Sequence, residues 1–416
     1  MSIGMQSGRR RARWASAVIG AALCLACGPS APAGGVGTSL GPTSGKAEEV
    51  AGLTLNVSTQ AMGGRASIDI AFSEGRGPDA RTAADQAIQE VRRIEGLVNM
   101  WSADSALQRW NAAVLEGAEA APMPRELALL VELGARVHAL TEGAYDPTVA
   151  RALAELGFYG DVLVVESTPG DSLGAGEVGG LGTGMGGVEV LWAGAEKAGD
   201  RSPFREHPGL PPDVVVWREL LAAAPLPGSG VPGSVPEAGS GEPAVGGMVE
   251  VRAGGRLLDL SALAKGYAAE RALLVLQGAG FPSARVDLGG SSVAASGERL
   301  PDDAGWPVEL PDGGTTRRIW LNGSALSTSG QTSLTIEGAE GAPSHLFDPR
   351  TLAPVAHATE QVAVVTRAAW LGDALSTALL VMGAEDGALW CRAHPELVMG
   401  WAFYVVGAPV AFEGEL

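Results

Sequence analysis

The sequence predicts an α+β fold, in which mixed sheets and packed helices form one domain. Strand-like and helix-like segments interleave along the 416 residues without a regular strand–helix–strand rhythm. Apolar residues make up 46% of the chain and aromatic residues only 5%, and Gly and Pro are abundant. This composition suits one globular domain of moderate size that carries additional segments.

The first half of the chain opens with strands and continues with helices. Apolar and polar residues alternate from near Leu53 and again over residues 67–72. Apolar residues at helical spacing then cover residues 84–97 and 127–140. Both stripes are typical of helices that bury one face in a core.

Regular patterning stops over residues 161–247, where Gly and Pro dominate. Only residues 188–192 and 214–223 have an ordered pattern inside this stretch. A segment of this composition cannot bury a core of its own. We therefore expect a domain over residues 51–416 that a low-complexity insertion interrupts at about 161–247.

Regular structure is expected again from Val249. A strand should end at Leu258, a helix should run from about Ala262 to Gln277, and Gly278 and Gly280 are typical of its end. The remaining elements are predicted strands at 284–288, 318–321, 333–336, 361–366 and 401–406, with an apolar helix at 368–382.

The N-terminus has the pattern of an export signal. Four arginines (Arg9, Arg10, Arg11 and Arg13) precede a short apolar run at 14–26, which predicts a signal peptide over residues 1–26. Leu25-Ala26-Cys27 resembles the end of a bacterial lipobox, so Cys27 is expected to carry a lipid; cleavage at an Ala-x-Ala-like site is the alternative. Residues 27–50 are expected to form a flexible tether. The protein is therefore expected to be exported, either anchored to the cell membrane through Cys27 or periplasmic.

Charge and cysteine content narrow the possible partners. A net charge of −18 argues against nucleic acid and against anionic membrane surfaces, which leaves the lipid anchor as the expected membrane contact. An anionic substrate would need local neutralisation by a metal, Lys or Arg. With Cys24 removed and Cys27 lipidated, Cys391 remains alone, so we expect no disulfide framework and a packing role for this residue.

Asp373 and Thr377 interrupt the apolar helix predicted at 368–382. Their spacing of four residues places both side chains on one helix face. A carboxylate and a hydroxyl there form half of a site for a hard cation such as Mg²⁺. The alternative is a partly exposed Asp beside a Thr that bonds to its own backbone.

Four other segments place polar residues at turns between apolar elements. Asp259 and Ser261 lie at a helix N-terminus with Lys265 one turn further, an arrangement suited to an anion, or alternatively a helix cap followed by a surface lysine. Residues 141–148 form a turn with Tyr145 and Asp146, which alone indicates only a helix end and a loop. Residues 326–330 are rich in hydroxyls, and residues 344–351 bring together His345, Asp348 and Arg350.

Taken in their order along the chain, these segments resemble the motifs of the FAD:protein FMN transferase family, the ApbE type. The resemblance covers roughly residues 53–406 apart from the insertion, and six or more motifs in the family's order make it specific. The matching pieces are Met62-Gly63; Met100-Trp101 with Ser105, Leu107 and Asn111; residues 143–148; residues 259–267; Leu288-Gly289-Gly290; residues 327–330; residues 345–351; and residues 373–377.

The resemblance implies an ApbE-like single catalytic domain that moves FMN from FAD to a Thr hydroxyl of a target flavoprotein, with release of AMP and with Mg²⁺. It implies that Asp373 and Thr377 bind Mg²⁺ together with the backbone carbonyl of Ala262. Asp259 and Lys265 would bracket FAD, and His345 would be the base or a proton shuttle, with Lys265 neutralising phosphoryl charge. The flavin and adenine pockets would be lined by Met62, Trp101, Ala144, Tyr145 and Asp146, with His345 also close to FAD.

Four positions depart from the family's usual residues: Gly64, Ser291, Gln331 and Leu352. Some of these replace carboxylates that could contact substrate or metal. Three alternatives to flavin transfer therefore stay open. They are an FAD diphosphatase in which water replaces the Thr, an exported FAD-binding lipoprotein without transfer activity, and an exported scaffold whose insertion binds a partner.

Overall fold

The computed structural model describes residues 52–155, 158–159, 162–163, 189–191, 248–331, 346–355 and 357–414. The predicted signal peptide and tether, most of the predicted insertion, the predicted strand at 333–336 and His345 lie outside these ranges. None of the described helices combines the length and the apolar character that a membrane-spanning helix requires.

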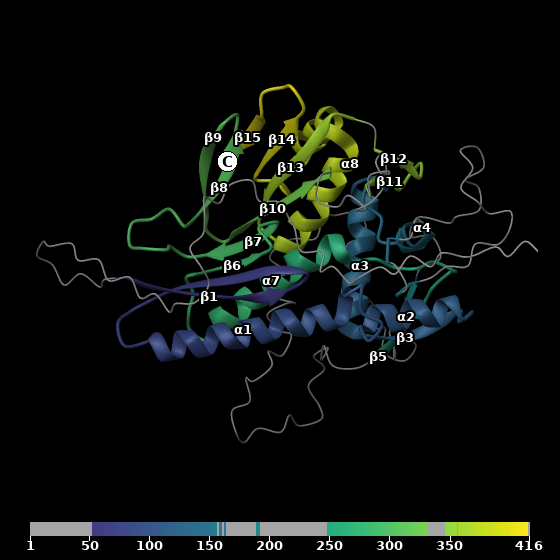
Figure 1. Ribbon diagram of the computed structural model, residues 1–416, viewed down its shortest axis with the longest axis horizontal. Helices are drawn as coiled ribbons and strands as arrows, with labels where there is room; N and C mark the ends of the chain where they lie inside the picture. The colour runs from purple at the N-terminus through teal and green to yellow at the C-terminus, as the bar shows by residue number, and fades with distance from the viewer. Residues whose placement is uncertain are drawn as a thin grey trace, which may run out of the picture.

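An eight-stranded sheet forms the centre of the molecule, in the order β1-β2-β6-β7-β10-β13-β14-β15 (Figure 1). Every ladder between named strands is antiparallel, and the sheets differ in their number of strands. The strands are β1 Leu53–Ala61, β2 Gly64–Phe72, β6 Ala284–Leu288, β7 Ser292–Ser296, β10 Ser324–Gly330, β13 Thr359–Thr366, β14 Gly400–Val405 and β15 Ala411–Gly414.

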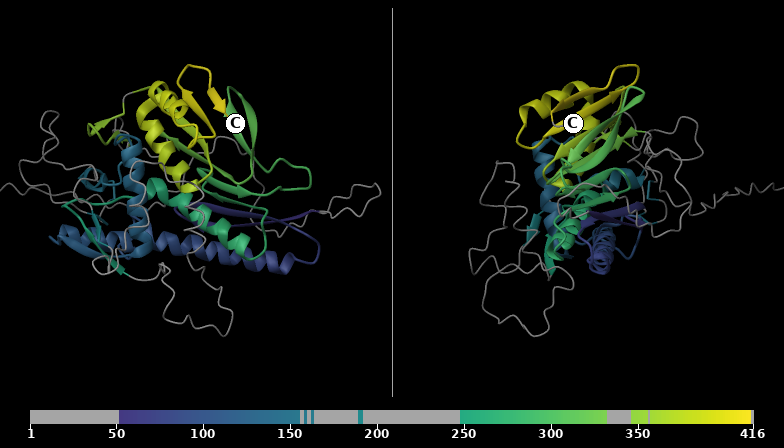
Figure 2. Two further views of the ribbon diagram at one scale, coloured as in Figure 1. Left: turned by 180° about the vertical axis from the view of Figure 1, so that it is seen from behind. Right: turned by 90° about the vertical axis from the view of Figure 1, so that its left-hand side faces the viewer.

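Three long helices cover one face of this sheet: α1 Gly77–Val98, α7 Ser261–Gly278 and α8 Ala369–Ala393 (Figure 1). Alternation along the strands divides the two faces. In β13, Val362 and Val364 belong to the core on the helix side, whereas Ala363 and Val365 belong to a second core. That second core is closed by the hairpin of β8 Trp306–Asp312 and β9 Thr315–Leu321, and Figure 2 shows the layers from the side.

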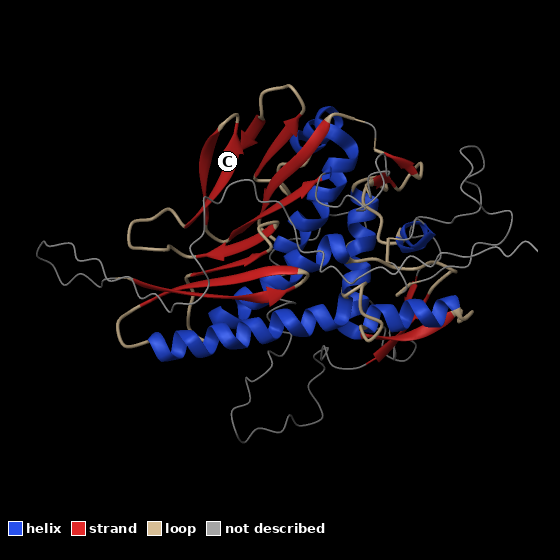
Figure 3. Cartoon of the chain, in the orientation of Figure 1, coloured by secondary structure: helices blue, strands red, loops and turns tan. Residues whose placement is uncertain are grey.

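A smaller region lies at one end of the long helix α1 (Figure 3). It contains α2 Ala106–Leu115, α3 Arg125–Leu140 and α4 Ala150–Glu155. Its three-stranded sheet has the order β3-β5-β4, with β3 Ala120–Pro124, β5 Met248–Arg252 and β4 Glu189–Leu191. The short strands β11 Phe347–Asp348 and β12 Ala353–Pro354 pair with each other.

Most predicted elements agree with the structure. The helix expected at 262–277 is α7, which ends at Gly278, and Gly280 has a left-handed φ of 83°. The strand expected to end at Leu258 is wrong, because β5 ends at Arg252. Gly254 and Gly255 have left-handed φ values of 57° and 75°, which turn the chain out of the ladder. The predicted α+β fold class is confirmed.

A buried ion-paired cluster joins α1, α3 and α7. Glu90 contacts Arg93 at 2.7 Å and Arg271 at 3.0 Å, and Arg93 also contacts Glu126 at 2.5 Å. The hydroxyl of Tyr267 donates to Glu126 at 2.8 Å. We call these five residues the α1–α3–α7 ion cluster; its carboxylates are buried and each has a cationic partner.

Candidate functional site

Asp373 lies on the face of α8 that packs against α7. Its side chain is buried, and its Oδ2 accepts from the Gly266 N–H at 2.9 Å. Its Oδ1 accepts from the Ser292 hydroxyl at 2.9 Å. Burial raises the pKa of Asp373, and the charge of Lys265 and the hydrogen bonds from Gly266, Ser292 and the Lys265 backbone offset only part of that effect. The carboxylate is thus held firmly in place, but its charge is under-compensated.

Glycine at position 266 permits this contact. A Cβ at Gly266 would lie 2.1 Å from the carbonyl oxygen of Ala369 and 2.8 Å from Cβ of Asp373. In a regular helix the Gly266 N–H would donate to the carbonyl of Ala262, four residues earlier. Here that N–H donates to Asp373, so the Ala262 carbonyl shares or loses its helical donor. Its oxygen is therefore a suitable additional ligand for a cation at this junction.

Thr377 lies one turn along α8, beside the end of β10. Its hydroxyl is 3.2 Å from that of Ser329, which is 2.8 Å from the hydroxyl of Ser376. The turn predicted at 326–330 is wrong, because these residues pair with β13 and form the C-terminal part of strand β10, next to the Asp373 helix. The buried hydroxyl of Ser327 in the same strand has no hydrogen-bond partner among the described residues.

Asp259 lies just before α7 and is held by three segments of the chain. Its Oδ1 accepts from the Ser261 N–H at 2.7 Å, and its own N–H donates to the Pro147 carbonyl at 2.7 Å. Its Oδ2 accepts from the Tyr159 hydroxyl at 2.5 Å. Sequence reasoning missed Tyr159, although the aromatic pair Phe158-Tyr159 directly before the Gly-rich stretch was a signal that could have found it.

Tyr145 is buried close to three carboxylates. Its hydroxyl has no hydrogen-bond partner within the described part of the chain. Burial raises the pKa of Tyr145 well above its usual range, and the charges of Asp259, Asp373 and Asp146 raise it further. Asp146 itself accepts from the N–H and the hydroxyl of Thr148, at 2.8 and 2.7 Å. The turn at 141–148 therefore brings an unpaired donor to the same junction.

Met62 and Trp101 lie on loops. Met62 has a left-handed φ of 53° in the β1–β2 turn, and the next strand begins beside Gly289, whose N–H donates to the Arg65 carbonyl at 2.8 Å. Trp101 is 47% exposed and contacts the rings of Phe158 and Tyr159 edge-on, at 5.9 and 6.1 Å between centroids.

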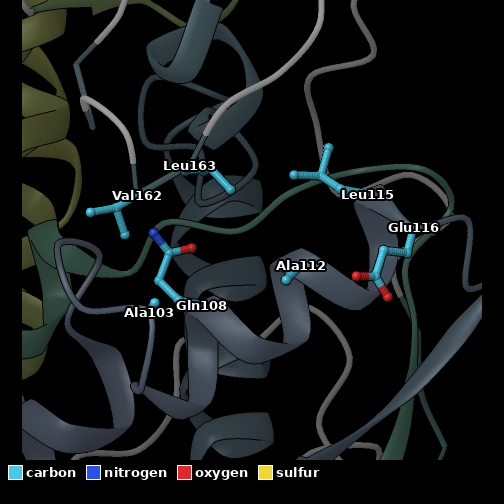
Figure 4. Close-up of a pocket in the computed structure, with 7 residues that line it drawn as sticks. All are labelled: Ala103, Gln108, Ala112, Leu115, Glu116, Val162 and Leu163. Carbon is cyan, nitrogen blue, oxygen red and sulfur yellow. The ribbon is translucent and has the colours of Figure 1, made fainter.

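A half-open cleft of about 260 Å³ lies next to the Trp101 loop (Figure 4). Side chains of α2 and of residues 162–163 face each other across it. It is lined by Ala103, Gln108, Ala112, Leu115, Glu116, Val162 and Leu163. None of the predicted site residues lines it, so we do not place the chemistry there.

The predicted residues fall into three groups by position. The first group lies where α7 packs on α8 and consists of Ala262, Lys265 and Asp373, with Thr377 one turn further along α8. The second group lies at the start of α7 and consists of Asp259 and the turn at Ala144–Asp146. The third group consists of Met62 in the β1–β2 turn and Trp101 in the loop before α2. His345 is outside the described residues, but the neighbouring segment places Arg350 next to Gly143, where an added Cβ would lie 3.3 Å from Arg350 Cγ.

The donor set at the α7–α8 junction consists of oxygens. Across the described ranges, no three His, Cys, Asp or Glu side chains are grouped so as to hold a metal ion. A cation here would therefore need the Ala262 carbonyl and the Thr377 hydroxyl beside the Asp373 carboxylate. Such a set fits a hard cation, and a cation there would offset the cost of burying the Asp373 carboxylate.

Two segments of the chain, residues 62–170 and 240–399, match the sequence model of the ApbE family. Together they make up more than half of the protein. The chain belongs to the ApbE family. The resemblance inferred from the motif order is thus confirmed.

Curated relatives of this ApbE-family chain carry the name FAD:protein FMN transferase. The protein of Klebsiella pneumoniae (strain 342) is 25% identical over 298 residues, which cover 70% of this chain and 68% of the relative. The protein of Escherichia coli (strain K12) is 31% identical over 135 residues, which cover 31% of this chain and 37% of the relative.

Solved structures of the family share the fold. The apo form of the Pseudomonas stutzeri flavinyl transferase ApbE has a TM-score of 0.60 at 19% identity and covers 88% of this chain and 95% of its own. The flavin transferase ApbE from Vibrio cholerae has a TM-score of 0.55 at 20% identity, with 88% and 97% covered. At these identities the likeness supports the fold alone.

Proposed function

We propose that this ApbE-family chain is a transferase that moves FMN from FAD to a Thr hydroxyl of a target flavoprotein and releases AMP. Family membership and the curated relatives' names support an enzyme of the flavin transferase class. The observation that carries the proposal is the under-compensated Asp373 carboxylate at the α7–α8 junction, among the family motifs.

The proposed reaction replaces the phosphoanhydride bond of FAD with a phosphoester bond to the target protein. The Thr oxygen forms a bond to the phosphorus of the FMN half, and the bond from that phosphorus to the bridging oxygen breaks. AMP leaves with the bridging oxygen, and the Thr proton passes to a base. His345 is the proposed base, because an imidazole can take up a proton near neutral pH.

The chain's own residues would bind and orient the diphosphate. Lys265 lies close enough to Asp373 to influence its pKa, and its ammonium could neutralise developing phosphoryl charge. Asp373, Thr377 and the Ala262 carbonyl would hold Mg²⁺, which supplies positive charge to the phosphoryl oxygens when bound. Asp259, Tyr145, Asp146, Ala144, Met62 and Trp101 are proposed to contact FAD.

The proposal places the enzyme outside the cytoplasm, with a lipid on Cys27 or free in the periplasm. The arginine-rich start and the apolar run before Cys27 support export. An acceptor outside the cytoplasm is then the expected partner. Globomycin treatment of producing cells, followed by intact mass of the protein, would distinguish lipidation at Cys27 from plain signal cleavage.

Incubation with FAD, Mg²⁺ and a Thr-bearing flavoprotein fragment tests the transfer. We expect the fragment to gain the mass of one FMN, with AMP formed in equal amount, and a Thr→Ala fragment to gain nothing. FMN and AMP formed at the same rate without acceptor would indicate a diphosphatase. FAD binding without AMP would indicate a binding protein, and absence of FAD binding would favour a scaffold.

A further inference from the structure

Tyr159 makes a buried contact that no sequence motif predicts. Its side chain is 2% exposed, and its hydroxyl donates to Asp259 Oδ2 at 2.5 Å across 100 positions of the chain. Burial, and then the charge and hydrogen bond of Asp259, raise the pKa of Tyr159 well above its usual range. The phenol therefore stays protonated and remains a donor to the carboxylate.

Asp259 depends on this contact for its orientation. Oδ1 accepts from the backbone of Ser261, whereas Oδ2 is oriented by Tyr159. Among the described residues, the Tyr159 hydroxyl is the only side-chain donor to Asp259. A hydrogen bond to a charged acceptor is stronger than one between neutral groups, so it restricts the carboxylate to one rotamer.

The ring of Tyr159 also supports Trp101. The two ring centroids are 6.1 Å apart at an interplanar angle of 62°, and Phe158 completes the group at 5.3 Å from Tyr159. Trp101 is partly exposed while Tyr159 is buried behind it. One side chain thus touches two residues, Trp101 and Asp259, that come from distant parts of the chain.

We propose that Tyr159 is a positioning residue for FAD: it fixes the Asp259 carboxylate through its hydroxyl and the Trp101 ring through its edge. This inference rests on the proposed function, in which Asp259 and Trp101 contact FAD. Side chains that are already held in the bound geometry lose less freedom when the ligand arrives. Tyr159 therefore acts on FAD affinity and not on the bond-breaking step.

The test variant is Tyr159→Phe, which removes one oxygen and keeps the ring. We expect KM for FAD in the transfer assay to rise roughly tenfold, the effect of one hydrogen bond to a charged group. The Kd for FAD, measured by flavin fluorescence without acceptor, should rise by about the same factor, while kcat stays within about twofold. A reversibly unfolded fraction would raise the apparent Kd by the inverse of the folded fraction, so the folded fraction of Tyr159→Phe is measured by urea unfolding and the Kd is corrected for it.

Tyr404→Phe is the matched control. The hydroxyl of Tyr404 donates to the Pro311 carbonyl at 3.1 Å, between β14 and the hairpin that covers the far face of the sheet. This variant removes the same atom from a half-buried tyrosine outside the candidate site. KM and Kd for FAD should stay at wild-type values.

A double-mutant cycle with Asp259→Asn tests whether Tyr159 acts through the carboxylate. If it does, adding Tyr159→Phe to Asp259→Asn should change Kd by less than about twofold, because coupled residues are not additive. If Tyr159→Phe raises Kd tenfold in the Asp259→Asn background as well as in the wild-type background, the two residues act independently and the coupling is overturned. Either an unchanged Kd in Tyr159→Phe, or a lower kcat at unchanged KM, would overturn the positioning role.

Tighter FAD binding by Tyr159→Phe would also overturn the inference, since it would show that the tyrosine withholds Asp259 from the substrate. The experiments distinguish a failure of this inference from a failure of the proposed function. If the wild-type protein transfers no FMN, the proposed function fails. If it does transfer FMN and Tyr159→Phe matches it in KM and Kd, only this inference fails.

Discussion

Two buried polar clusters share helix α7, and they are built in opposite ways. In the α1–α3–α7 ion cluster, Glu90 is paired with both Arg93 and Arg271. At the α7–α8 junction, Asp373 is equally buried, but it is held by N–H and hydroxyl donors, with Lys265 as the nearby charge. One cluster is neutralised within the protein, and the other is not.

The pKa shifts of the two carboxylates record this difference. Burial alone would raise the pKa of Glu90, but the hydrogen bonds and charges of Arg93 and then Arg271 outweigh it and lower the pKa. Burial raises the pKa of Asp373, and its donors do not reverse the effect. The two shifts have opposite signs because two arginines contact Glu90, whereas Asp373 is deeply buried and is held mainly by neutral donors.

Unpaired polar groups follow the same division. The hydroxyl of Tyr267, in the ion cluster, donates to Glu126, whereas those of Tyr145 and Ser327, near Asp373, have no partner in the described ranges. Buried polar groups are normally paired, so these two hydroxyls are candidates for contact with a bound ligand. The ion cluster stabilises the fold, and the junction is the better candidate for binding.

The largest effect on folding should come from Glu90→Gln. This change keeps the side-chain volume but removes the charge that compensates Arg93 and Arg271, and breaking a buried pair destabilises by about 3–5 kcal/mol. Urea unfolding should show the loss, while FAD binding by the folded protein stays unchanged. Glu309→Gln removes an exposed partner of Arg318 and should change stability by no more than about 0.5 kcal/mol.

Acid titration provides a second test of the ion cluster. The folded pKa of Glu90 lies below its ordinary value of 4.5, so its contribution to stability is present above pH 4.5. That contribution is lost as the pH falls below 4.5 through the folded pKa. Wild-type protein should lose stability over this window more steeply than Glu90→Gln, and equal slopes would contradict the assignment.

Asp373→Asn should affect stability and activity in the opposite way to Glu90→Gln. It removes an under-compensated charge, so stability in urea should be unchanged or higher. FMN transfer should fall about 100-fold or more, which is the loss expected when the carboxylate ligand of a catalytic cation is removed. Asp386→Asn, at an exposed position on the same helix, is the control. Transfer at the wild-type rate by Asp373→Asn would break the comparison.

Gly266→Ala tests the close approach of α7 and α8. The added methyl would meet the Ala369 carbonyl at 2.1 Å, so the helices must separate, at a cost of about 1–3 kcal/mol. FAD binding should weaken as Asp373 moves. Gly96→Ala is the control: a Cβ there meets nothing within 4 Å, and alanine should stabilise α1 by about 0.5–1 kcal/mol.

The smallest effect is expected for Tyr145→Phe. Removing an unpaired buried hydroxyl should stabilise the protein without FAD by about 1 kcal/mol. FAD affinity should fall about fivefold if the ligand accepts from this hydroxyl. Tyr267→Phe removes a paired hydroxyl and should destabilise instead. The same sign of stability change in both variants would erase the distinction between the clusters.

Much of the fold was predictable because its signals are local. Alternation predicted β2, and the helical stripes predicted α1 and α3, since periodicity reports which face is buried. Cys391 is buried as expected, and burial raises its thiol pKa to about 12. The end of β5 was predicted wrongly, because the apolar residues Leu257 and Leu258 continue the strand pattern beyond the glycine turn.

The sequence by itself determined the types of most elements, the order of the family motifs and the spacing of Asp373 and Thr377, because each depends on residues close together in the chain. Only the tertiary structure decided that Gly266 and Ser292 donate to Asp373, that Tyr159 donates to Asp259, and that Glu90 meets Arg271. These partners lie 81 to 181 positions apart. Their meeting depends on how whole helices and strands pack, which no local pattern encodes.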